Sequence, residues 1–410
     1  MTWLVVLWLA ANTPAAAAGA AAATAAATVA VPASRAGGAP ASAPLGVSYG
    51  GWKGQFNDAA GRLAKFKDIG FRVVSFVPTY AYEGLDKINV ASGPDPVELG
   101  RAVEAALRAG FSVVVKPHLD PPAYGPGFAG WKSENYSWRA HCPWRGFFDV
   151  DPMGAAYREG IVFASLRALK DAFDGLGAGA AAVPAVRLEV GAELMNAVVY
   201  TPERWVTLLA AAKKERHRLG LDGRVLLSHN FTHHLEIPED FVGRMDPPRR
   251  SALKRYIRGL DALALSQYMD LTAAMPAGER DRRLPSVDEV AQALLAHERN
   301  FRKDILQGAL GLRADEIPPF HIGEFGVGRG GLRHPNLWDG AATPAEEKEL
   351  AREITRGHEG LLRYLALPAG RTAGSAVLWV TGPHYDVFGW DDAKNAIPEA
   401  AAAIKQGLRR

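Results

Sequence analysis

The chain has 410 residues, of which 48% are hydrophobic and 22% are charged, a balance typical of a soluble protein with a full core. Its 47 Lys and Arg residues nearly equal its 44 Asp and Glu residues, so the formal net charge is only +3 and no basic surface for nucleic acid is indicated. The single cysteine, Cys142, excludes an internal disulfide and a zinc site built from several thiolates.

An apolar run from Trp3 to Ala11 opens the chain, and small residues of the kind found at signal-peptide cleavage sites follow it. The run is too short to span a bilayer as a helix. No Lys or Arg precedes it, so only the α-amino group supplies the positive charge of a signal peptide. We expect a signal peptide over residues 1–25 and a secreted or periplasmic protein. The alternative is a disordered Ala-rich tail.

The next segment, residues 14–44, consists almost entirely of Ala, Gly, Pro, Ser and Thr. It has too little bulky apolar surface to offset the entropy lost on ordering. We therefore interpret residues 26–44 as a linker and residues 45–410 as one domain. No later stretch is apolar and long enough for a membrane helix.

From Leu45 onward, short β-rich apolar runs alternate with helical patterns. Most of the runs are continuously apolar, as expected for parallel strands that are covered on both faces. The predicted strands are Gly46–Tyr49, Phe71–Val77, Phe111–Lys116, Val186–Val190, Val225–Ser228, Ala262–Tyr268, Pro319–Gly323 and Ala376–Val380. The predicted helices are Ala59–Lys67, Pro96–Ala109, Met153–Phe173, Pro202–Leu219, Val287–Leu306, Ala345–Leu365 and Ile397–Leu408. Thr201 before Pro202 and Thr343 before Pro344 indicate helix starts.

Eight strands, most of them followed by a helix, predict a protein of the α/β class with a single (β/α)8 TIM barrel. The helix between the fifth and sixth strands is not clear from the pattern. Three long loops are predicted after strands 3, 5 and 7, at Asp120–Pro152, Phe231–Arg258 and Phe325–Thr343. These loops lie on the C-terminal face of such a barrel, where long loops shape a binding site.

Two glutamates stand at the C-terminal ends of predicted strands. Glu193 follows the fourth strand in LEVGAEL, and Glu324 follows the seventh in FHIGEFG. Side chains at these positions point into the active-site mouth of a barrel. Cleavage of a glycosidic bond needs two carboxyl groups, one to protonate the leaving oxygen and one to attack the anomeric carbon. The alternative is that each glutamate forms an ion pair with a Lys or Arg at the barrel rim.

Several short stretches occur in the order and at the barrel positions that are typical of one enzyme clan. They are Val77–Tyr80, Val115–Asp120, Trp144–Gly146, Gly191–Leu194, His229–Phe231, Gln267–Leu271 and Gly323–Gly326. Together they resemble clan A of the glycoside hydrolases and, within it, glycoside hydrolase family 113, whose known members are β-mannanases. The resemblance spans residues 46–379. It implies that Glu193 is the acid/base and Glu324 the nucleophile. It also implies that Tyr268 donates a hydrogen bond to the nucleophile and that Trp379 forms the floor of the subsite of the cleaved sugar.

Further substrate contacts are expected at strand ends and in the loops of the C-terminal face. His118, Asp120 and Asn230 are interpreted as partners of sugar hydroxyls, with local hydrogen bonding in the loops as the alternative. Rigid aromatic faces with polar edges suit sugar rings, although loop packing explains part of such a set. The aromatic residues expected to contact the substrate include Tyr80 and Trp144. Arg145, next to Trp144, is expected to contact the substrate as well.

The sequence also departs from the clan pattern. Ala192 stands where many clan members have an Asn directly before the acid/base, and the second strand lacks the Arg that many place beside the nucleophile. Histidines near the strand ends raise the alternative of a metal-dependent hydrolase. However, the first strand has no His-x-His pair, and His321, three residues before Glu324, is expected on the opposite face of a regular strand.

We therefore expect a secreted, endo-acting, retaining hydrolase of a β-linked, mannan-like polysaccharide. It should need no cofactor or metal, act as a monomer on a polysaccharide or oligosaccharide, and bind neither nucleic acid nor, after processing, a membrane. The alternatives are a hydrolase of another β-glycan such as a bacterial exopolysaccharide, a non-catalytic glycan-binding barrel, and the metal hydrolase.

Overall fold

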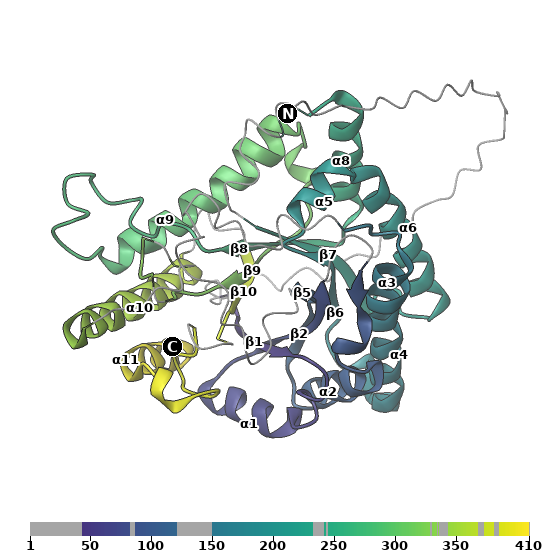
Figure 1. Cartoon of the computed structure of the whole chain (residues 1–410), viewed down its shortest axis with the longest axis horizontal. Coiled ribbons are helices and arrows are strands. Elements are labelled where there is room, and N and C mark those ends of the chain that lie inside the picture. Colours follow the sequence, from purple (N-terminus) through teal and green to yellow (C-terminus); the bar gives the residue numbers. More distant parts are fainter. Residues whose placement is uncertain are drawn as a thin grey trace, which may run out of the picture. The chain divides into compact units, whose positions relative to one another are not determined.

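A closed barrel of parallel strands forms the centre of the domain (Figure 1). The computed structural model describes residues 43–82, 87–120, 150–232, 242, 245–328, 330–333, 335, 343–367, 373–380 and 385–409. The barrel closes because β1 (Leu45–Gly51) pairs with both β2 (Val73–Tyr82) and β10 (Ala373–Leu378). Between β2 and β10 lie β4 (Ser112–Val115), β6 (Val186–Ala192), β7 (Val225–Thr232), β8 (Ala262–Gln267) and β9 (Phe320–Phe325). The predicted (β/α)8 barrel is confirmed.

Two short strands extend the barrel at its C-terminal end. β5 (His118–Asp120) continues from β4 after Pro117 and pairs in parallel with the end of β2, and β3 (Ile88–Asn89) pairs antiparallel with that end. Strand β5 matters for the site because its pairing with β2 holds His118 at the C-terminal end of the barrel.

Helices surround the barrel in chain order (Figure 1). They are α1 (Ala59–Ile69), α2 (Pro96–Arg108), α3 (Ala155–Tyr157), α4 (Ala164–Leu176), α5 (Met195–Tyr200), α6 (Pro202–Arg218), α8 (Pro247–Gly259), α9 (Val287–Arg299), α10 (Pro344–Leu365) and α11 (Pro398–Leu408). Two π-helical segments, η6 (Arg158–Phe163) and η8 (Asn300–Ala309), interrupt or extend them. Short 3-10 turns are η1 (Val90–Ser92), η7 (Gly177–Ala181), η9 (Ala314–Glu316) and η10 (Ala393–Asn395).

The prediction of a loop over Phe231–Arg258 is wrong in its second half, because α8 occupies Pro247–Gly259. The Asp246 side chain accepts a hydrogen bond from the backbone N–H of Arg249 and caps this helix, and Pro247 takes its first turn. Asp246 followed by Pro247 is a sequence pattern that indicates the start of a helix. Five of the thirteen residues of α8 are Lys or Arg, so the apolar periodicity of this helix is weak.

The two expected Thr-Pro helix starts differ. Thr343 caps α10 in a capping box with Glu346, as predicted. Thr201 does not cap α6, since its hydroxyl donates to the backbone carbonyl of Ala197 in the preceding helix α5. Because α5 ends where α6 begins, this hydroxyl satisfies the end of one helix rather than the start of the next.

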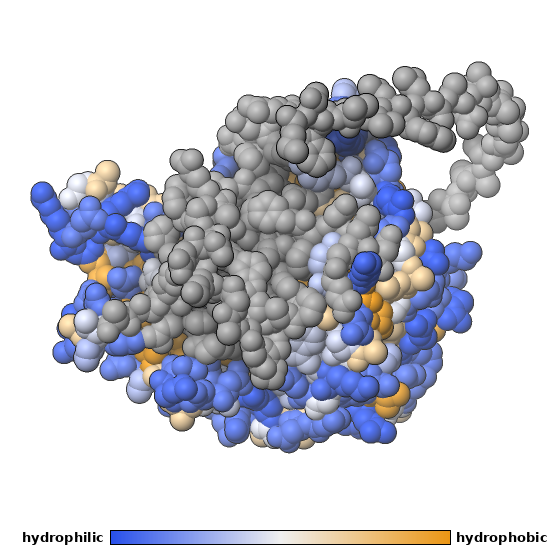
Figure 2. All heavy atoms as spheres, viewed as in Figure 1, coloured by the Kyte–Doolittle hydropathy of each residue, from blue (hydrophilic) through white to orange (hydrophobic). Residues whose placement is uncertain are grey.

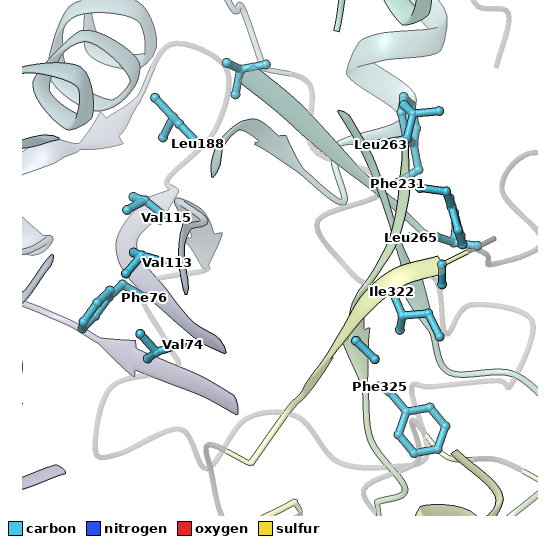
Figure 3. Close-up of a cluster of buried hydrophobic side chains, with 14 of the residues drawn as sticks. Val74, Phe76, Val113, Val115, Leu188, Phe231, Leu263, Leu265, Ile322 and Phe325 are labelled. Atoms are coloured by element: carbon cyan, nitrogen blue, oxygen red, sulfur yellow. The ribbon is translucent and has the colours of Figure 1, made fainter. Parts of the chain in front are cut away.

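The outer face of the barrel strands carries the main apolar core. Figure 3 shows Val74 and Phe76 of β2, Val113 and Val115 of β4, and further side chains of β6 to β9 that belong to this core. The inner face is different. Val73, Val114 and Val377 form a small separate apolar cluster there. Barrel interiors are usually filled by branched apolar residues, so the polar residues that share this inner face need a separate explanation.

On the face seen in Figure 2, hydrophilic residues predominate among the described residues, and hydrophobic ones form small groups. In the part of the chain that the structure describes, no helix is long and apolar enough to cross a bilayer.

Candidate active site

Glu324 follows an extra residue in β9. Leu265 of β8 pairs with Ile322, but the next residue, Ser266, pairs with Glu324, so β9 has one more residue than β8 at this point. Gly323 is the additional residue. A Cβ on it would lie 2.2 Å from Oδ1 of Asn230, so no larger residue fits without a shift of its neighbours. The bulge therefore turns Glu324 into the barrel.

His321, in the regular part of β9 before the bulge, lies on the same inner face as Glu324. His321 pairs with Ala264, which is also the partner of the inward-facing Asn230. The expectation that His321 and Glu324 lie on opposite faces is therefore wrong, because it assumed an unbroken period of two. Burial and the charge of Arg187 hold the pKa of His321 well below its usual range, and its Nδ1 lies 2.9 Å from the Ser375 hydroxyl.

Glu193 also follows an irregular stretch of strand. Glu189 pairs with Ser228, but the next recorded pair is Ala192 with Asn230, so β6 carries an extra residue here. Glu193 has φ 59°, the only positive φ among the non-glycine residues that the structure describes. A non-glycine residue in this region costs energy and persists only where its surroundings enforce it. Its backbone N–H donates to the Asn230 carbonyl at 2.8 Å, which fixes this conformation.

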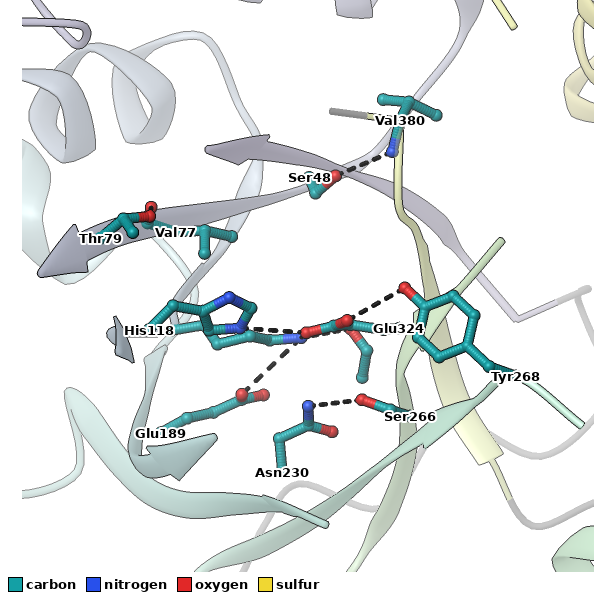
Figure 4. Close-up of polar contacts among 12 residues, drawn as sticks. Ser48, Val77, Thr79, His118, Glu189, Asn230, Ser266, Tyr268, Glu324 and Val380 are labelled. Carbon is teal, nitrogen blue, oxygen red and sulfur yellow. Dashed lines mark hydrogen bonds and ion pairs between the residues drawn. The ribbon is translucent and has the colours of Figure 1, made fainter. Parts of the chain in front are cut away.

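The Glu324 carboxylate is contacted at both oxygens (Figure 4). Oε1 accepts a hydrogen bond from Lys116 Nζ at 3.1 Å and lies 3.1 Å from His118 Nε2. Oε2 accepts a hydrogen bond from the Tyr268 hydroxyl at 3.0 Å. Burial and the charges of Glu324 and Glu193 raise the pKa of Tyr268 well above its usual range, so this group remains a hydroxyl donor. The carboxylate thus has a fixed orientation.

Buried charges lie beneath this carboxylate. Glu189 Oε2 is 3.8 Å from Lys116 Nζ, and Glu189 Oε1 is 3.9 Å from Arg187 Nε. Burial raises the pKa of Glu189 to about 7, although Lys116 and Arg187 act in the opposite direction. Burial also lowers the pKa of Arg187. Sequence reasoning missed all three residues. Their signal was a charged residue within the apolar runs VVVK and VRLEV.

Trp379 lies beside the site. Its ring stacks on His118 with centroids 5.3 Å apart and an angle of 17° between the planes. Its backbone N–H donates to the Phe325 carbonyl at 2.7 Å, which ties the end of β10 to the residue after the nucleophile candidate. Trp379 is half-buried, so part of its surface is open to solvent.

The other predicted site residues lie at different depths. Asn230 is fully buried on the inner face, and its Nδ2 donates to the Ser266 hydroxyl at 2.8 Å (Figure 4). Asp120 ends β5 and is partly exposed. Tyr80 belongs to the apolar core and packs against Gly93, where a Cβ would lie 2.2 Å from its ring. Trp144 and Arg145 lie outside the described residues.

The histidines do not gather as metal ligands do. Within the described ranges, no three His, Cys, Asp or Glu side chains form a group that could hold a metal ion. His229 packs outside the barrel against Trp205 and Tyr256, with its Nδ1 2.9 Å from the Tyr256 hydroxyl. Burial lowers the pKa of His229 to about 3.

Comparison with solved structures agrees with the barrel. One GH113 β-1,4-mannanase complex has 18% sequence identity and a TM-score of 0.52, over 90% of this chain and 99% of its own. Another GH113 β-1,4-mannanase structure has 17% identity and a TM-score of 0.51, over 89% of this chain and 98% of its own. No protein-family model matches the sequence, and no curated protein matches it significantly. The similarity establishes the TIM-barrel fold.

The raised pKa of Glu189 predicts a specific pH dependence of stability. Below pH 4.5 this carboxyl is neutral in both states. As the pH rises towards 7, it ionises in the unfolded chain first, so its contribution to the free energy of unfolding falls. Glu189→Gln does not titrate. Relative to the native protein, the variant should therefore gain up to about 3 kcal/mol between pH 4.5 and 7, with no further change above pH 7. Urea unfolding of both proteins across this range measures the difference. A difference that stays constant with pH would contradict the assignment.

Proposed function

We propose that this chain is a retaining glycoside hydrolase that cleaves a β-linked polysaccharide at internal bonds. The observation that carries the proposal is the Glu324 carboxylate, held at both oxygens at the end of β9, with a second buried glutamate, Glu193, directly after β6. Both charges act on the Tyr268 hydroxyl, which supports their placement in one barrel mouth. The fold shared with two β-1,4-mannanases supports a β-mannan as substrate.

The chemistry of the two glutamates follows from their surroundings. In the first step Glu193 donates a proton to the glycosidic oxygen while Glu324 attacks the anomeric carbon, which forms a glycosyl ester and releases the leaving sugar. In the second step Glu193 takes a proton from water, the water oxygen attacks the anomeric carbon, and Glu324 leaves as a carboxylate. The Tyr268 hydrogen bond and the Lys116 ammonium fix the attacking group in both steps.

The identity of the sugar is a separate part of the proposal. Ala192 stands directly before Glu193 in the sequence and pairs with Asn230 of β7. Its methyl side chain offers no amide group to a sugar hydroxyl. This feature favours a second candidate, a β-glycan other than mannan, such as an exopolysaccharide of the producing cell. The two candidates share one mechanism and differ only in the polymer that is cleaved.

A panel of polysaccharides tests the activity. The protein should release oligosaccharides from β-mannan, glucomannan, β-glucan, xylan or a microbial exopolysaccharide, as measured by size-resolved product analysis. Internal cleavage gives products of mixed length at early times. Binding to a glycan with no turnover on any member of the panel would instead indicate a non-catalytic barrel.

Two variants serve as matched controls for this assay. Glu324→Ala should abolish turnover on every substrate, because no nucleophile remains. Glu193→Ala should keep first-step activity on an aryl glycoside with a good leaving group, which needs little acid assistance, and added azide should rescue its turnover. Equal losses in both variants, without rescue by azide, would argue against these roles.

The stereochemistry of the product tests the mechanism. Retaining enzymes have carboxyl groups about 5–5.5 Å apart, which leaves no room for water between the nucleophile and the anomeric carbon. Two inversions at that carbon should give a first product with the β configuration, and a 2-fluoro glycoside should label Glu324. Proton NMR of the first product measures the configuration. An initial α-anomer, or a gap of about 6.5–9.5 Å in a crystal structure, would exclude retention.

We also propose that residues 1–25 direct export, so that the enzyme meets its polymer outside the cytoplasm. The apolar run Trp3–Ala11 and the small residues after it support this. Expression of the full chain in a bacterial host should place a shortened protein in the periplasm or medium, with its new N-terminus among the Ala-rich residues. Mass spectrometry locates that terminus. An uncleaved chain confined to the cytoplasm would contradict export.

A further inference from the structure

Lys116 connects opposite sides of the barrel. It follows β4, and β4 is separated from β9 by β6, β7 and β8 in one direction and by β2, β1 and β10 in the other. The side chain is 1% exposed, so it lies in the barrel interior. Its Nζ donates to the Gly323 carbonyl at 2.6 Å and to Glu324 Oε1 at 3.1 Å. One ammonium group therefore contacts both the backbone of the β9 bulge and the carboxylate that the bulge turns inward.

We propose that Lys116 is a positioning residue for the nucleophile: it fixes the β9 bulge and places its positive charge beside the oriented Glu324 carboxylate, while Glu189 supplies the buried counter-charge of the ammonium. The inference rests on the function proposed above, to which it adds a specific role for three residues that sequence reasoning did not select.

The distances favour positioning over simple neutralisation of Glu189. Lys116 Nζ lies 3.1 Å from the Glu324 carboxylate but 3.8 Å from that of Glu189, and both of its hydrogen bonds to described residues go to β9. A lysine that served only to balance Glu189 would direct its N–H groups to that carboxylate. Glu189 instead has no hydrogen-bond partner for either oxygen among the described residues.

Charge balance explains why a buried ammonium is tolerated here. Removing an unpaired ammonium from water costs several kcal/mol, so a partner is required. Lys116 forms ion pairs with Glu189 from β6 and Glu324 from β9, and the charges of Arg187 from β6 and Glu193 after β6 act on Glu189. His118 and Tyr268 contact the same Glu324 carboxylate, and His321 contributes no positive charge because its pKa is held well below its usual range. The two cations thus lie among three carboxyl groups.

The test uses three variants of the full chain and one activated aryl β-glycoside that the native protein cleaves. Lys116→Met removes the charge and both hydrogen bonds but keeps a side chain of similar length. Lys116→Arg keeps the charge. Glu189→Gln removes the counter-charge without touching β9. Near-ultraviolet circular dichroism establishes that each variant is folded. The readouts are kcat/KM against pH and the rate at which a 2-fluoro glycoside labels Glu324.

Lys116→Met should lower kcat/KM by about 100-fold, the size of effect expected when a reacting group is misplaced. It should also move the acid limb of the pH profile upward, because the variant loses the cation that lies 3.1 Å from the carboxylate. Lys116→Arg should restore most of that shift. Glu189→Gln should not move the acid limb upward, since loss of a negative charge cannot favour protonation of the nucleophile. An unshifted acid limb in folded Lys116→Met would overturn the proposal, as would an equal upward shift in Glu189→Gln.

If Lys116→Met does not fold, Lys116→Gln takes its place, since it keeps a donor and removes the charge; its acid limb should rise in the same way. A crystal structure separates this inference from the proposed function. Should the native protein cleave no glycan, the proposed function fails, but the Tyr268–Glu324 hydrogen bond and the Gly323 bulge should still be lost or displaced in the Lys116 variant. Their retention in unchanged geometry would overturn the positioning role.

Discussion

The hydrogen bond from the Lys116 ammonium to the Gly323 carbonyl spans the barrel, and the arrangement of the site depends on it. The neighbouring strand β8 has one residue fewer than β9 at this level, so the ladder between them is interrupted at Gly323. A backbone group at an interrupted ladder needs a partner elsewhere. Lys116 provides that partner and uses the same ammonium to contact Glu324. The irregular backbone and the reactive carboxylate are thereby stabilised by one group.

Both candidate catalytic glutamates depend on an extra residue in their strand. In a regular strand, alternate residues face the same side, and a slip of one residue reverses every later side chain. The bulge before Glu324 lets Gly323 and Glu324 both face inward, and the one before Glu193 is followed by a positive φ at the glutamate itself. Each carboxyl group thus reaches the barrel mouth because its strand has one extra residue near its C-terminal end. The part of the strand before the extra residue remains regular and well packed.

This construction explains which features the sequence revealed. Continuous apolar runs located the eight barrel strands, and two glutamates at strand ends were visible because their position relative to a run is local information. Register is not local, so the bulges and the inward position of His321 could not be read from one strand alone. The partners of Lys116 and Glu189 lie on other strands for the same reason. Helix α8 was also not predicted, but for a different reason: its start was indicated locally by Asp246 and Pro247.

The two faces of the barrel strands have separate tasks. The outer face packs against the helices and holds the continuous apolar core, whereas on the inner face Val73, Val114 and Val377 form a small separate apolar cluster. Next to that cluster lie Lys116, Arg187 and Glu189, whose burial opposes folding unless their charges compensate one another. A barrel interior filled with branched apolar side chains would stabilise the fold more. Because the helices and the outer face supply the stability, the interior can carry charges that orient a carboxylate at the mouth rather than stabilise the fold itself.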